Sequence, residues 1–128
     1  SLTNMVQYFE VNGTQEPADF NVMVAATLAR ECGTDITGMV EQVQTYQGEV
    51  DFLEFAAKAG AEALNAGAKR EGTGKSFTKY DLYDAFTHDL SLAAEFVTGL
   101  IKSLSGEAVF SEPTKESALP KKRKKSAE

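Results

Sequence analysis

The stretch EVDFLEFAAKAGAEALNAGA, residues 49–68, is the longest helical pattern in the sequence and decides the fold class. Its apolar residues recur at helical spacing and share one face, which carries Phe52, Phe55, Ala56, Ala59 and Ala63. The opposite face is polar, and Glu54 precedes Lys58 in the order that stabilises a helix. Because the apolar face consists mostly of alanine with Gly60, the stretch predicts a long helix that a neighbouring helix can approach closely.

Two shorter helices are predicted before this stretch. Asp19 fits as the N-cap of a helix that ends near Cys32, with Gly33 just past its end. The apolar row of that helix is Phe20, Val24, Leu28 and Cys32, widened by Met23, Ala25 and Ala29. Residues 34–46 predict a shorter helix with an apolar face of Met39, Val40 and Val43.

Two further helices are predicted after a Gly-rich polar loop at residues 70–76. Thr78 and Asp81 have the spacing of a capping box, which opens a short helix carrying Leu82, Tyr83 and Phe86. Asp89 or Ser91 caps the last helix, which stops at Gly106. Its apolar stripe is Ala93, Phe96, Val97, Leu100, Ile101 and Leu104. We expect Phe96, Leu100 and Leu104 to be buried against the helix of residues 49–68.

The N-terminal segment has the alternation of a strand rather than of a helix. Residues 5–11 alternate between two faces, and Asn12-Gly13 is a strong hairpin-turn dipeptide. The returning strand, residues 14–16, is short and stops at Pro17, which cannot donate a ladder hydrogen bond. The sequence therefore predicts a mainly α domain of four to five helices with a short N-terminal β-hairpin or single strand.

Charge divides the chain into two parts. Residues 1–119 contain 8 basic and 18 acidic residues, a net charge of −10, whereas the last nine residues carry +4. The basic run Lys121–Lys125 has no large apolar neighbour to bury, so we expect a domain over residues 1–106 and a disordered tail over 107–128. A solvated tail is the default interpretation. Contact with an acidic partner or nucleic acid, and a nuclear import signal, are the alternatives.

The sequence offers no catalytic constellation. Gly72–Ser76 (GTGKS) looks like the end of a phosphate-binding loop, but Lys69 stands where that motif needs a glycine, and a helix precedes it. His88 has no nucleophile beside it, and Cys32 fits a small core residue. One cysteine and one histidine cannot close a zinc site. We therefore expect no enzyme, no cofactor and no metal, and no membrane-spanning helix because no apolar run is long enough.

Four stretches together resemble a known family. They are Tyr8–Thr14 (YFEVNGT), residues 55–72 with their ending AGAKREG, Phe77–Phe86 (FTKYDLYDAF) and Ala93–Leu104 (AAEFVTGLIKSL). In this order they resemble the tail assembly chaperones of long-tailed bacteriophages and prophages. The resemblance implies a small acidic helical protein of the bacterial host cytoplasm that is absent from the finished virion. It also implies partners: the tape-measure protein, whose apolar helical segments it keeps soluble, and tail-tube subunits.

The resemblance further implies a longer product made by programmed frameshifting near the end of the short reading frame. Codons for Lys121-Lys122 and Lys124-Lys125 can form an A-rich slippery sequence, which reading the gene would test. The alternative function is a small regulatory or nucleic-acid-associated protein that uses its basic tail.

A chaperone for apolar helices needs an apolar surface that folding leaves open. The candidate partner-binding residues are Val109 and Phe110, together with whatever part of the Met39, Val40 and Val43 face stays uncovered. Self-association through the same surface is expected when the client is absent.

Overall fold

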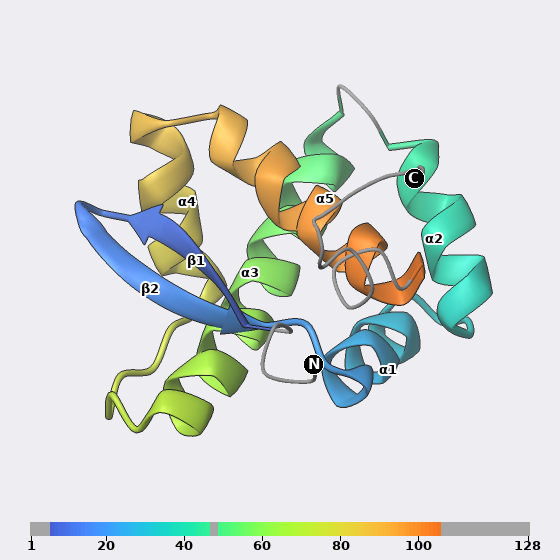
Figure 1. Ribbon diagram of the computed structural model, residues 1–128. Coiled ribbons are helices and arrows are strands. Elements are labelled where there is room, and N and C mark those ends of the chain that lie inside the picture. Colours follow the sequence, from blue (N-terminus) through green and yellow to red (C-terminus); the bar gives the residue numbers. More distant parts are fainter. Residues whose placement is uncertain (1–5, 47–48, 106–128) are drawn as a thin grey trace, which may run out of the picture.

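The structure is a computed structural model and describes residues 6–46 and 49–105 (Figure 1). It is mostly helical, with an N-terminal antiparallel hairpin, as the sequence predicts. The elements are β1 (Val6–Val11), β2 (Thr14–Asp19), α1 (Val22–Glu31), α2 (Ile36–Gln44), α3 (Val50–Glu71), α4 (Lys79–His88) and α5 (Ser91–Ser105). Val109, Phe110 and the basic run Lys121–Lys125 lie outside the described residues.

The hairpin turns at Asn12-Gly13, where both residues have positive φ angles of 51° and 87°. β2 is longer than predicted, because it continues through Pro17, which pairs with Tyr8, to Asp19, which pairs with Val6. Pro17 is tolerated because both members of a two-stranded sheet are edge strands. Residues 16–19 of β2 are all buried, so this strand belongs to the core of the domain.

α3 runs through the middle of the molecule, with α1 and α2 on one side and α4 on the other (Figure 1). The predicted end at Ala68 is too early, because the helix continues to Glu71 and stops at Gly72, whose φ is 71°. The cations of Lys69 and Arg70 favour this extension, since they lie at the negative end of the helix dipole.

Two glycines of α3 allow its neighbours to approach. A Cβ added at Gly67 would overlap the carbonyl oxygen of Pro17, so β2 lies directly against the helix backbone there. A Cβ at Gly60 would lie 3.0 Å from Leu82 Cδ1 and 3.2 Å from Phe96 Cδ2. The small-residue face therefore receives β2, α4 and α5.

α1 begins later than predicted. Its N-cap is Asn21, whose side-chain oxygen accepts from the Val24 backbone N–H at 2.9 Å. Asp19 does not cap the helix, because it ends β2 and its carboxylate is buried. The predicted helix end is confirmed, with Cys32 at the C-cap and Gly33 at a φ of 76°.

Asp35 is the N-cap of α2, and its carboxylate accepts from the Gly38 backbone N–H at 2.8 Å. Met39 and Val43 are buried in the core and Val40 is half-buried. The apolar face predicted for this helix therefore serves mainly to attach it to the domain.

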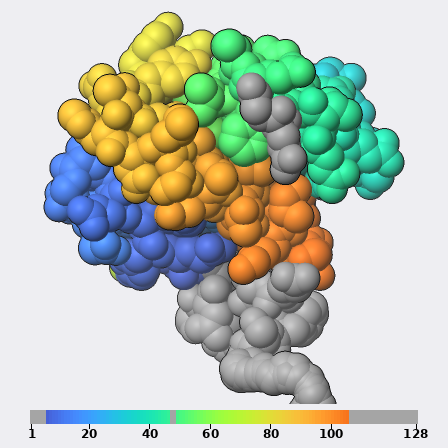
Figure 2. Space-filling view, turned by 90° about the horizontal axis from the view of Figure 1, so that it is seen from above, coloured from blue at the N-terminus to red at the C-terminus, as the bar shows by residue number. Residues whose placement is uncertain are grey.

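The capping box of α4 is confirmed: the Asp81 carboxylate accepts from the Thr78 backbone N–H at 2.8 Å. α5 then packs on α3 with Phe96 and Leu100 fully buried and Leu104 half-buried. The Phe96 ring stacks on Phe9 of β1, with ring centroids 4.5 Å apart. In Figure 2, α5 occupies the middle of the visible face, with the hairpin and α4 to one side and α2 to the other.

Candidate functional site

A groove lies beside the buried polar groups, between α1 and the C-terminal half of α3. Its volume is about 540 Å³. α1 contributes Met23, Val24 and Thr27 to one wall. α3 contributes Glu62, Asn65, Ala66, Lys69 and Arg70 to the other. Asp19 and Asn21 close the end of the groove where β2 passes into α1.

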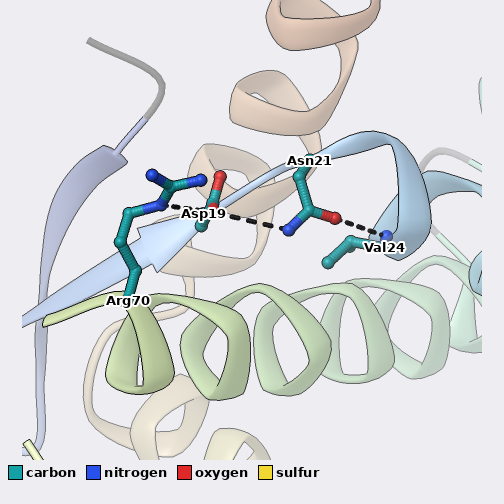
Figure 3. A network of polar contacts seen from close by, with 4 residues as sticks. All are labelled: Asp19, Asn21, Val24 and Arg70. Atoms are coloured by element: carbon teal, nitrogen blue, oxygen red, sulfur yellow. Dashed lines mark hydrogen bonds and ion pairs between the residues drawn. The ribbon is translucent and has the colours of Figure 1, made fainter. Parts of the chain in front are cut away.

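Asp19 is the centre of a polar network at that end (Figure 3). It is 1% exposed, and its Oδ2 atom accepts from Arg70 Nε at 2.8 Å and from Asn21 Nδ2 at 3.3 Å. Asn21 in turn caps α1 through Val24. The buried carboxylate therefore joins the end of β2, the start of α1 and the end of α3. A buried charge is stable only when it is paired in this way.

A second ion pair anchors the loop after α3. Lys75 Nζ lies 2.6 Å from Glu16 Oε2, and Glu16 is buried in β2. The Lys75 ammonium of the GTGKS sequence is thus bound to a carboxylate of the same chain. Asn65 holds the far end of the loop, since its Oδ1 atom accepts from the Phe77 N–H at 2.7 Å and its Nδ2 atom donates to the Phe77 carbonyl at 3.0 Å. These contacts give the loop a structural role.

Arg70→Met is expected to lower the free energy of unfolding by about 1–3 kcal/mol. The substitution leaves the Asp19 carboxylate buried without its cation, but Arg70 is half exposed and water can partly replace it. Lys69→Met is the matched control, because Lys69 is the neighbouring exposed cation and makes no ion pair within the described residues. It should change stability by less than about 0.5 kcal/mol. Urea unfolding measures both, and equal midpoints would contradict the role of Arg70.

The outward face of α1 remains open beside the groove. Val22 is 68% exposed and Met23 is 64% exposed. Ala26 and Thr27 follow one turn later and are half-buried. A shallow hollow of about 850 Å³ continues past Ala26 to Gly33 and Ile36, at the start of α2. An apolar strip therefore extends along α1 with no charged residue before Arg30.

Met39, Val40 and Val43 of the predicted partner-binding set do not form this surface, and the remaining two, Val109 and Phe110, lie outside the described residues. Met39 and Val43 are core residues, so only Val40 of that face is partly accessible. Met23 was expected to widen the apolar row of its helix, but it points away from the core. Sequence spacing could not identify the α1 strip, because both faces of the helix are largely apolar and only packing decides which is covered.

His88 and Cys32 occupy ordinary structural positions. His88 is the exposed last residue of α4. Cys32 is half-buried at the end of α1, and burial raises the pKa of its thiol. Within residues 6–46 and 49–105, no group of three or more metal-ligating side chains gathers. In the same ranges no helix combines the length and apolar character needed to cross a bilayer.

No family model, curated protein or solved structure matches this chain. The residues of the groove and of the α1 strip are therefore the structural features from which a function can be inferred.

Proposed function

We propose that the protein is a tail assembly chaperone of a long-tailed phage or prophage, which binds apolar helical segments of the tape-measure protein and helps recruit tail-tube subunits. The observation that carries the proposal is the open apolar strip on α1, where Val22 and Met23 remain about two-thirds exposed. Exposed apolar surface next to a groove is typical of a site that binds another protein.

The strip has features that suit the binding of an apolar partner helix. Met23 provides a flexible apolar side chain that adapts to different partners. Ala26 is small, so a second helix can approach the α1 backbone closely. The groove along α3 gives the edge of such a helix a place to lie, as in other complexes of an amphipathic helix with a groove.

The net charge of the chain supports the same function. A total charge of −6 keeps a protein with an open apolar strip soluble and disfavours non-specific contact with nucleic acid. The basic C-terminal run favours the alternative, a regulatory or nucleic-acid-associated protein. A DNA shift assay separates the two, because binding through the run would weaken steeply with salt.

Met23→Asp is expected to reduce, by several-fold, the amount of soluble tape-measure protein obtained on co-expression with the tape-measure gene encoded nearby. A carboxylate on the strip would have to be desolvated when an apolar helix docks. Met23 is already 64% exposed, so the fold should be unaffected, and circular dichroism would verify this.

Leu90→Asp is the matched control. Leu90 is also 64% exposed but lies in the turn between α4 and α5, away from the strip. It should leave client solubility unchanged. Equal solubility with Met23→Asp and with the unmodified protein would exclude the strip from the client site.

A further inference from the structure

The α3 wall of the groove carries a fixed pattern of charge. Glu62 and Lys69 both line the groove and lie two helical turns apart, about 10 Å along the axis. This spacing returns to the same side of a helix, and Ala66 lies between them. The wall thus presents an anion, a small apolar residue and a cation in line.

Neither charge is paired among residues 6–46 and 49–105. The ion pairs among the described residues join Lys58 to Glu54, Arg70 to Asp19 and Lys75 to Glu16. Glu62 and Lys69 make no ion pair and no side-chain hydrogen bond in this part of the chain. Glu62 is half-buried in the groove wall, where a charge without a partner is less well solvated than on an open surface.

The neighbouring carboxylate at the end of the groove is already neutralised. Asp19 is bound by Arg70 and Asn21, so it contributes little net charge. The opposite wall, formed by Met23, Val24 and Thr27, carries no charge at all. Glu62 at one end and Lys69 at the other are therefore the charged lining residues that have no ion-pair partner among the described residues.

We propose that the groove selects a partner helix that carries one acidic and one basic residue seven positions apart, with apolar residues between them on the same face. The basic residue pairs with Glu62 and the acidic residue with Lys69, while the apolar residues contact Ala66 and Met23. This inference rests on the proposed function, because it names the kind of helical segment that the protein binds.

The test uses three alanine-based helical peptides that share a Leu pair at positions i+3 and i+4. They differ only at positions i and i+7, which carry Glu and Lys, Lys and Lys, or Glu and Glu. The unmodified protein should bind the Glu/Lys peptide about three- to tenfold more tightly than either other peptide at low salt. The preference should decline as salt rises. Binding is measured by fluorescence anisotropy.

Single charge reversals provide the matched variants. Lys69→Glu should transfer the preference to the Lys/Lys peptide, and Glu62→Lys should transfer it to the Glu/Glu peptide. Each preference is a ratio within one protein, so a modest loss of stability does not affect it. As a second pair, Glu62→Gln and Lys69→Gln should each weaken the selection.

Several results would overturn the proposal. A preference of the unmodified protein for the Lys/Lys peptide would mean that only the overall acidic charge acts. Equal binding of the three peptides, or no binding, would contradict the selection of a partner helix by Glu62 and Lys69. Dimerisation of the free protein that Lys69→Glu abolishes would assign the groove to a second copy. The co-expression result with Met23→Asp is independent of all of these and decides the proposed function separately.

Discussion

Replacing Phe96 by alanine is expected to lower the free energy of unfolding by about 3–5 kcal/mol. Phe96 is completely buried, stacks on Phe9 at 4.5 Å and packs against the glycine surface of α3 at Gly60. Its removal leaves a cavity where β1, α3 and α5 meet, and these elements cannot all collapse into it. Such a loss is a large fraction of the stability of a small domain.

Denaturant unfolding followed by circular dichroism measures this effect. Phe96→Leu is the conservative comparison and should cost less than half as much, because it retains most of the buried apolar volume. Leu90→Ala, at an exposed position, should change stability by less than about 0.5 kcal/mol. If Phe96→Ala were no more destabilising than Leu90→Ala, α5 would not pack as the structure describes.

Gly67→Ala has the second large expected effect, a loss of about 2–4 kcal/mol. The added methyl group would overlap the Pro17 carbonyl oxygen and lie 2.8 Å from the Ala18 nitrogen, so the backbone of β2 must move. Alanine is intrinsically the better helix residue by about 1 kcal/mol, and this gain opposes the loss. The close contact between β2 and α3 therefore decides whether Gly67→Ala lowers or raises the free energy of unfolding.

Gly60→Ala is the matched control on the same helix. Its added methyl group would meet side-chain atoms of Leu82 and Phe96 at 3.0 and 3.2 Å, and side chains shift more easily than a strand backbone. Gly67→Ala should therefore unfold at a lower temperature than Gly60→Ala. A stabilised Gly67→Ala protein would place β2 farther from α3 than the structure has it.

Much of the fold could be predicted from local sequence. The Asn12-Gly13 turn, the Thr78–Asp81 capping box and the Cys32-Gly33 helix end depend on neighbouring residues, and all three are confirmed. The burial of Phe96 and Leu100 followed from helical spacing alone.

The sequence predictions were wrong where the local structure depends on residues far away in the chain. Asp19 has the chemistry of an N-cap, but its partner is Arg70, and sequence spacing gives no sign of that pairing. β2 continues through Pro17 because Gly67 leaves space for it on α3. Met23 lies on an apolar helix, but no other described element covers its side. The groove and its charges could not be predicted for the same reason, since α1 and α3 meet only in the folded chain.

The two ion pairs of β2 have a consequence for the order of folding. Asp19 and Arg70 are 51 positions apart, and Glu16 and Lys75 are 59 positions apart. Contacts over such separations form slowly, because a long loop must close before they contribute. α1 to α4 can form locally during synthesis, but Phe9 of β1 meets Phe96, the ring on which it stacks, only when α5 has emerged. The N-terminal hairpin, although made first, is therefore expected to reach its native position among the last parts of the domain.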